Sequence, residues 1–168
     1  MLFMSYVGFS SMMYQDYVSF LRDIIGEKLF SEKLNLWDDP FDKRMEYRSY
    51  FDAEGVPKKK MDLIKDGEVR NLAYDTFTAN KDNLPSTGHA KGGFRSAPTI
   101  GGTNTEIHSG KMSYDEMLSE VDRGIYIQRV SMSPNYTSGD FSAVMKGGQL
   151  IEHGELQMTL KEITVTGN

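Results

Sequence analysis

The chain has 168 residues, a formal net charge of −5, 39% hydrophobic and 26% charged residues, and no cysteine. This length and composition predict a water-soluble, folded protein with a hydrophobic core. The negative charge argues against broad nucleic-acid binding, which needs a basic face; the lack of cysteine excludes disulfides and thiolate chemistry and fits a reducing compartment such as the cytoplasm.

The first residues, 1–9, are apolar, lack a basic leader and are too short to span a bilayer, so no membrane attachment is expected. Between residues 10 and 30, apolar side chains recur every three or four positions, which predicts a helix. We therefore expect an N-terminal helical segment over residues 1–33, continuing a truncated upstream domain, and a β-rich domain over residues 34–168.

From residue 34 onward, short alternating runs predict strands separated by turns. The strongest signal is Asp66-Gly67 between two half-apolar runs, which predicts a hairpin. The run 150–156 repeats this design around His153-Gly154 and indicates a second hairpin. The turn carboxylates are expected to be solvated; they are Asp38, Asp39, Asp52 and Glu54.

The polar, glycine-rich tract 83–96 is expected to be disordered without a partner, and residues 74–79 fit a short helix or a strand equally well. A second helix is predicted over residues 114–123, because Ser113 and Glu116 form a capping box and Gly124 suits its C-terminal end. Strands are predicted to follow at 125–130 and 160–165. The fold class is therefore α+β, with a predominantly antiparallel sheet.

No catalytic constellation emerges from the residue types and their spacing. His89, His108 and His153 lack a second histidine or cysteine at metal-ligand spacing, so we expect surface or loop histidines and no metal site. There is also no nucleophile elbow, phosphate-binding loop or dinucleotide fingerprint.

Two glycine-led polar segments, 101–107 and 137–142, could line a groove for an extended peptide held by main-chain hydrogen bonds. An ordinary hairpin turn and a central strand paired on both sides are the alternatives. The candidate peptide-binding residues are Gly102, Thr103, Asn104, Thr105, Gly139 and Asp140.

The order of several short motifs resembles the C-terminal portion of the TldD/PmbA family, the microcin-maturation metalloproteases that are also labelled modulators of DNA gyrase. The motifs are Phe51-Asp52-Ala53-Glu54-Gly55-Val56-Pro57, Ser86-Thr87-Gly88-His89-Ala90, Thr103-Asn104-Thr105, Ser138-Gly139-Asp140-Phe141-Ser142, Ile151-Glu152-His153-Gly154-Glu155 and Glu162-Ile163-Thr164-Val165-Thr166-Gly167-Asn168.

The resemblance implies a zinc-dependent peptidase system whose active subunit carries a His-Glu-x-x-x-His helix and a cysteine, neither of which is present in this sequence. Gly139-Asp140-Phe141-Ser142 is more similar to the PmbA (TldE) branch, which serves as the non-catalytic partner. The chain is thus expected to be inactive alone and to help bind an unfolded peptide. Zinc would be held by an upstream segment or by a TldD-type catalytic subunit. The expected partner is that subunit or a second copy of the chain in a dimer. A non-enzymatic assembly module is the alternative.

Overall fold

The computed structural model describes residues 8–93 and 95–168, so most of the apolar start lies outside the described residues. The chain divides into two compact units, Met1–Ser109 (unit 1) and Gly110–Asn168 (unit 2). This division differs from the boundary expected near residue 33. The reason is that Phe9 and Leu21, from the expected helical segment, are buried in the same hydrophobic cluster as the strands that follow.

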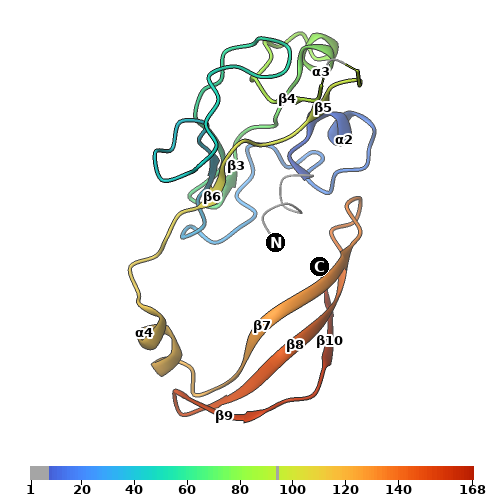
Figure 1. Cartoon of the computed structure of the whole chain (residues 1–168). Helices are drawn as coiled ribbons and strands as arrows, with labels where there is room; N and C mark the ends of the chain where they lie inside the picture. The colour runs from blue at the N-terminus through green and yellow to red at the C-terminus, as the bar shows by residue number, and fades with distance from the viewer. Residues whose placement is uncertain (1–7, 94) are drawn as a thin grey trace. The chain divides into compact units, whose positions relative to one another are not determined.

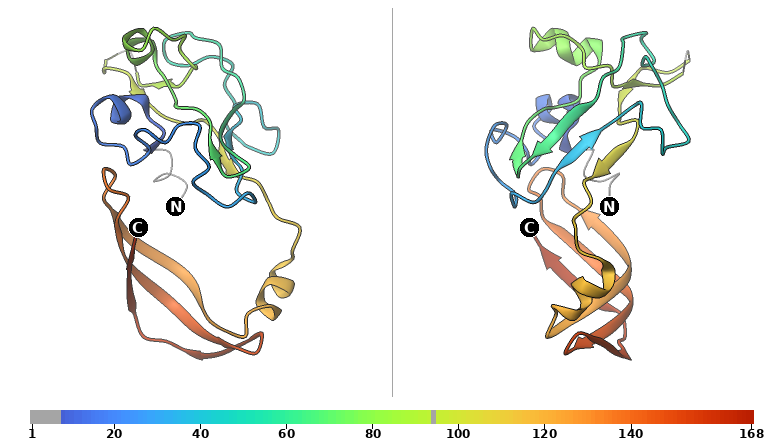
Figure 2. Two further views of the ribbon diagram at one scale, coloured as in Figure 1. Left: turned by 180° about the vertical axis from the view of Figure 1, so that it is seen from behind. Right: turned by 90° about the vertical axis from the view of Figure 1, so that its left-hand side faces the viewer.

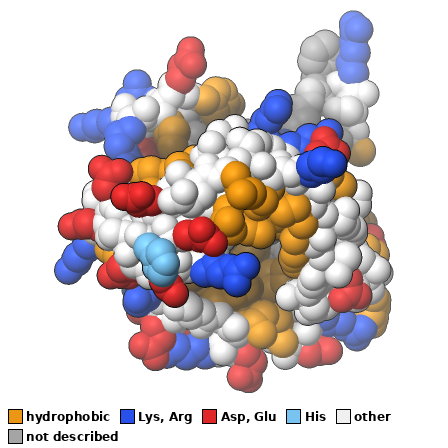
Figure 3. Space-filling model, turned by 90° about the horizontal axis from the view of Figure 1, so that it is seen from below, with side chains coloured by type: hydrophobic (Ala, Val, Ile, Leu, Met, Phe, Trp, Pro, Cys, Tyr) orange, Lys and Arg blue, Asp and Glu red, His pale blue; other side chains and the backbone are white. Residues whose placement is uncertain are grey.

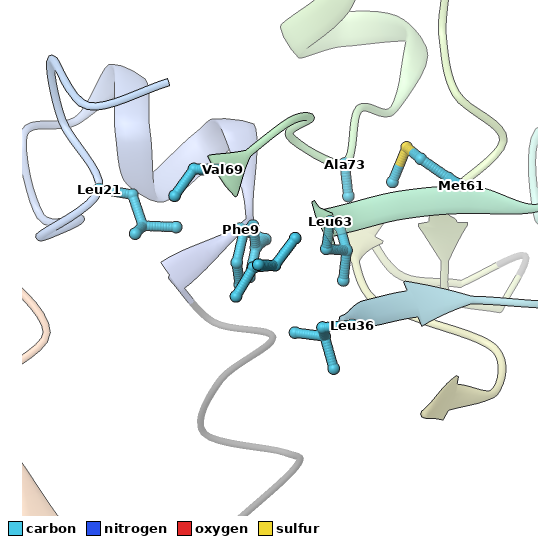
Figure 4. Packing of buried hydrophobic residues seen from close by; sticks show 8 residues of the cluster. Phe9, Leu21, Leu36, Met61, Leu63, Val69 and Ala73 are labelled. Carbon is cyan, nitrogen blue, oxygen red and sulfur yellow. The ribbon is translucent and has the colours of Figure 1, made fainter. Parts of the chain in front are cut away.

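Unit 1 is built on a four-stranded antiparallel sheet in the order β3-β2-β1-β6 (Figures 1 and 2). Its strands are β1 (Leu36–Asp38), β2 (Met61–Lys65), β3 (Glu68–Val69) and β6 (Thr105–Ile107). A two-stranded sheet pairs β4 (Ala90–Lys91) with β5 (Thr99–Ile100). Side chains from the N-terminal segment and the larger sheet, among them Phe9, Leu36 and Leu63, converge in the core (Figure 4).

The helix expected over residues 10–30 is wrong beyond its first turns. The helix α2 covers only Ser11–Gln15, and left-handed residues follow at Tyr17 (φ 63°), Asp23 (φ 64°) and Gly26 (φ 89°). The Ser19 hydroxyl donates to the Gly8 carbonyl at 2.7 Å and accepts from the Leu21 amide at 3.1 Å, which fixes a compact loop. The loop buries apolar side chains at helix-like spacing without being a helix.

The hairpin predicted at Asp66-Gly67 is confirmed between β2 and β3, with φ values of 51° and 78° that suit a two-residue turn. The second hairpin is confirmed between β8 (Phe141–Glu152) and β9 (Glu155–Thr159), where His153 and Gly154 have φ values of 50° and 79°. The two hairpins belong to different sheets in different units.

Unit 2 contains the helix α4 and a sheet in the order β10-β8-β7, with β9 also paired to β8 (Figure 2). Its elements are α4 (Tyr114–Ser119), β7 (Arg123–Pro134), β8 (Phe141–Glu152), β9 (Glu155–Thr159) and β10 (Ile163–Gly167). The capping box of Ser113 and Glu116 is confirmed. The helix ends at Ser119 and does not reach residue 123, because Arg123 and Gly124 already belong to β7 and pair with Glu152 and Ile151. The strands predicted at 125–130 and near 160–165 correspond to β7 and β10.

The tract 83–96 is not the unstructured loop expected from its composition. It contains β4, and its His89 side chain is buried. Just before it, the helix α3 (Thr76–Lys81) settles the ambiguous residues 74–79, capped by the Asp75 carboxylate that accepts from the Thr78 amide. Helices and antiparallel strands together confirm the α+β class. Within the described residues, no helix is both long enough and apolar enough to cross a membrane.

Candidate functional site

The carboxylate of Asp38, at the end of β1, fixes the turn that leads into β6. It is 1% exposed and accepts hydrogen bonds from the main-chain amides of Thr103 and Asn104, the shortest at 2.8 Å, and from the Thr105 hydroxyl at 3.2 Å. A carboxylate that accepts several amide hydrogen bonds holds their loop in one conformation. The expectation of a solvated Asp38 is therefore wrong.

His89 lies directly behind this carboxylate. Its Nε2 is 3.4 Å from Asp38 Oδ2, its Nδ1 is 2.8 Å from the Thr87 hydroxyl, and its side chain is 2% exposed. The expectation of a surface histidine is thus also wrong. Burial by itself raises the pKa of Asp38, but the hydrogen bonds from His89 and from the Thr103 and Asn104 amides outweigh burial and hold that pKa below its ordinary value.

Burial limits what the Asp38–His89 pair can do chemically. A general acid or base has to reach the proton that it transfers. Side chains that are 1% and 2% exposed cannot touch a substrate. The pair therefore positions main chain, and its hydrogen bonds place the start of β6.

A second buried carboxylate, Asp52, orders the neighbouring loop. It accepts from the amides of Glu54 and Val56 at 2.9 Å each and from the Ala90 amide at 3.0 Å, and it is 6% exposed. Asp52 was expected to be solvated, and this expectation is wrong. The Asp-x-Glu-Gly turn around Asp52 is visible in the sequence, but its link to β4 across the unit is not.

β6 forms the edge of its sheet, because within the described residues it pairs only with β1. The Asp39 amide donates to the Asn104 carbonyl and the His108 amide donates to the Asn35 carbonyl. Bonded pairs alternate in an antiparallel ladder, so Glu106 also turns its main-chain groups toward β1. The amides and carbonyls of Thr105 and Ile107 consequently point away from β1, toward the open edge.

The structure brings four of the six candidate peptide-binding residues together. Gly102, Thr103, Asn104 and Thr105 form the turn and first residue of β6 described above. The other two, Gly139 and Asp140, belong to unit 2, in the turn between β7 and β8. The two segments thus lie in different compact units.

In that second turn, Gly139 has a φ of 79° and its amide donates to the Asn135 carbonyl at 2.8 Å. The Asp140 carboxylate accepts from Asn168 Nδ2 and from the Ser138 hydroxyl, each at 2.7 Å. These two hydrogen bonds lower the pKa of Asp140. The turn between β7 and β8 is thus tied to the last residue of the chain.

Comparison with known proteins places these features in one family. The whole chain, residues 1–168, matches the model of the PmbA/TldA metallopeptidase C-terminal domain. The chain belongs to the PmbA/TldD family. The polar turns singled out above are therefore features of a PmbA/TldD C-terminal domain.

Three relatives illustrate the match. Metalloprotease PmbA of Escherichia coli O157:H7 is 30% identical over 151 residues, which cover 89% of this chain and 31% of that protein. A metalloprotease TldD homolog of Buchnera aphidicola is 30% identical over 152 residues, which cover 89% of this chain and 32% of that protein. The crystal structure of TldE from Thermococcus kodakarensis superposes with a TM-score of 0.87 at 31% identity, covering 96% of this chain and 37% of that one.

The chain spans about a third of the length of these relatives. It is equally identical, at 30%, to a PmbA and to a TldD homolog, so identity does not separate the two branches. The closer likeness of Gly139-Asp140-Phe141-Ser142 to the PmbA branch stays a prediction.

The described residues of this PmbA/TldD domain do not fit the zinc ion that the family resemblance implies. His89 is buried against Asp38, the His108 ring lies 5.2 Å from the Trp37 ring, and His153 Nδ1 contacts the exposed Asp122 carboxylate at 2.7 Å. Over residues 8–93 and 95–168, no group of three or more His, Cys, Asp or Glu side chains could hold a metal ion. We therefore assign no zinc ligand to these residues.

Proposed function

We propose that this chain is the C-terminal domain of a PmbA/TldD-type peptidase system and that it holds an unfolded peptide by strand addition to β6. The observation that carries this proposal is the free edge of β6, whose Thr105 and Ile107 main-chain groups point away from β1. In strand addition, the sheet edge forms hydrogen bonds with the peptide main chain, so this mode of binding suits unfolded substrates of varied sequence.

The hydrogen bonds to Asp38 support this role. They hold the turn at Thr103 and Asn104 before any ligand arrives, so β6 is already ordered. Binding to an ordered edge avoids the entropy cost of arranging that edge during association. The short side chains of Gly102, Thr103 and Thr105 also leave room for a second main chain beside them.

Catalysis, in this proposal, belongs to another part of the system. Two of the relatives described above, from Escherichia coli and Buchnera aphidicola, are named metalloproteases, and catalytic zinc sites typically use three protein ligands plus a water molecule. We propose that zinc is held by a further segment or by a TldD-type subunit that assembles with this domain, or with a dimer of it, in the cytoplasm. Elemental analysis of the isolated chain should find no stoichiometric zinc, and one tightly held zinc per chain would contradict this assignment.

The edge of β6 can be tested by removing one outward-facing amide. Ile107→Pro deletes the amide while leaving the bonds that Glu106 and His108 make to β1, and Ile107→Ala keeps the amide while trimming the side chain. We expect Ile107→Pro to weaken binding of a fluorescein-labelled unfolded peptide about tenfold, the effect of one or two lost hydrogen bonds, and Ile107→Ala to bind nearly as wild type.

Circular dichroism should show that both variants retain cooperative melting. Equal binding by the two variants would mean that the peptide does not use this edge. Cleavage of the same peptide, with and without a co-expressed TldD-type subunit, then separates a peptidase component from the alternative of a non-enzymatic assembly module. Peptide capture without cleavage in either case would favour the module.

A further inference from the structure

Two lysines flank a hollow at the same end of the sheet as the Asp38 turn. The hollow has a volume of about 470 Å³ and is lined in part by Lys58 and Lys91, with the exposed aromatic side chains of Tyr47 and Phe51 on its wall. Lys58 precedes β2 and Thr103 precedes β6, and these two strands both run antiparallel to β1. Lys58 and Thr103 therefore lie at one end of the sheet.

The side chain of Lys58 is half-buried and lines this hollow. Its Nζ donates to the Thr103 hydroxyl at 2.5 Å. Asp52, which also lines the hollow, and Asp38 nearby already accept hydrogen bonds from the main-chain amides described above. Within the part of the chain that the structure describes, neither Lys58 nor Lys91 forms an ion pair with a carboxylate.

The pKa of Lys58 is lowered, which indicates that its positive charge is not fully balanced by nearby negative charge. Burial lowers its pKa, the positive charge of Lys91 lowers it further, and attraction to Asp38 and Asp52 only partly offsets these effects. Two neighbouring ammonium groups, one of them partly desolvated, are stabilised by an anion that both can contact.

We propose that Lys58 and Lys91 bind the C-terminal carboxylate of a peptide whose last side chain packs on Tyr47 and Phe51. The proposal rests on the proposed function, since a peptide paired antiparallel with β6 would have its C-terminal end beside the start of β6. That start is Thr103, whose hydroxyl already accepts the Lys58 hydrogen bond. The aromatic wall favours a peptide end over a free inorganic anion, which has no apolar group to bury.

The first test does not require β6 to bind anything. The full chain is titrated with N-acetylphenylalanine, with its amide, and with inorganic phosphate, while NMR follows the lysine side-chain signals. We expect the free acid to shift the signals of Lys58 and Lys91 and to raise the pKa of Lys58, and the amide to do neither. A phosphate response as strong as that of the free acid would overturn the assignment to a peptide end, and so would equal responses to acid and amide.

Charge-removing variants supply the controls. Lys58→Met and Lys91→Met keep the aliphatic stem, and each should weaken the free-acid response at least fivefold. Lys59→Met removes a neighbouring exposed lysine that does not line this hollow and should leave the response unchanged. Retained binding in both Lys58→Met and Lys91→Met would overturn the proposal. Because the two variants test the site independently, a folding defect in one of them still leaves the other as a test.

A longer peptide then separates this inference from the proposed function. With a free C-terminus it should bind the wild-type chain about tenfold more tightly than its amidated form, and Lys58→Met should abolish that difference. Equal binding of the two forms, still sensitive to Ile107→Pro, would refute the carboxylate site and leave the β6 edge standing. Binding of the free-C-terminus peptide that Lys58→Met weakens but Ile107→Pro leaves unchanged would refute the edge and leave the carboxylate site standing.

Discussion

The Asp38 carboxylate is surrounded by donors that come from distant parts of the chain. The amides of Thr103 and Asn104 lie 65 and 66 residues away in sequence, and His89 comes from the tract before β4. Sequence patterns report mostly on neighbours along the chain, so neither the burial of Asp38 nor that of His89 could be read from their surroundings. The turn residues Thr103 to Thr105 were recognised because their local composition is distinctive.

Removing the charge of Asp38 should be costly. In Asp38→Asn one carboxylate oxygen becomes a donor that faces other donors, and breaking a buried pair costs about 3–5 kcal/mol. We expect urea denaturation to show a loss of about 3 kcal/mol. Asp39→Asn is the matched control: its carboxylate is only partly buried and lies 3.6 Å from Lys60, so its loss should stay within about 1 kcal/mol.

The same carboxylate gives the protein a defined response to acid. The folded-state pKa of Asp38 is below its ordinary value of 3.8, so its contribution to stability is complete above that value and is lost as pH falls through the lowered pKa. The difference in unfolding free energy between wild type and Asp38→Asn should thus shrink below about pH 4. A difference that stays constant from pH 7 to pH 2 would rule out this role.

The hairpins and caps could be predicted because their signals are short and local. Asp66-Gly67, His153-Gly154 and the Ser113–Glu116 capping box all formed as expected. The helix over residues 10–30 failed because apolar spacing of three and four residues also suits a loop whose turns use left-handed residues, as at Tyr17 and Asp23. Pattern alone does not distinguish these two ways of burying Phe9 and Leu21.

The turn between β2 and β3 requires glycine at position 67 for two reasons, a positive φ and a close contact with main chain, and these can be tested separately. A Cβ at Gly67 would lie 2.3 Å from the Phe30 carbonyl oxygen, whereas a Cβ at Gly55 would meet nothing within 4 Å, although both residues have positive φ (78° and 81°). Gly55→Ala should therefore cost only the conformational strain, about 1–2 kcal/mol. Gly67→Ala should cost about 1–3 kcal/mol more, from the clash with main chain.

Chemical denaturation of the two variants measures both costs. Similar losses for Gly55→Ala and Gly67→Ala would mean that the loop carrying Phe30 moves aside easily. In that case the N-terminal segment is only loosely attached to the hairpin.

At the scale of the whole molecule, unit 2 buries little apolar surface of its own. Its buried hydrophobic side chains, among the residues described, are Ala143 and Ile151. Its exposed large ones are Met112, Tyr114, Met117, Ile125, Val130, Leu156 and Met158. Hydrophobic side chains gather in patches between charged ones on the face shown in Figure 3. Surfaces of this kind mark sites of contact with other protein.

We accordingly expect the chain to associate into dimers or larger assemblies at micromolar concentration, as measured by sedimentation velocity. Val130→Lys combined with Met158→Glu should shift the distribution toward monomer, because both side chains are exposed in unit 2. Leu84→Glu, at an exposed position of unit 1, is the control and should leave it unchanged. A wild-type chain that sediments as a monomer would contradict the expectation.

The long sequence separation between Asp38 and its amide partners has a consequence for synthesis on the ribosome. The β2–β3 hairpin can form as soon as it emerges, whereas residues 103–105 are made some 65 residues after Asp38. Until then, burying Asp38 would leave its carboxylate charge without the amide hydrogen bonds that stabilise it, at a cost of several kcal/mol. Nascent chains that end before Thr103 should therefore keep β1 open to chaperones, and unit 1 should close in one late step.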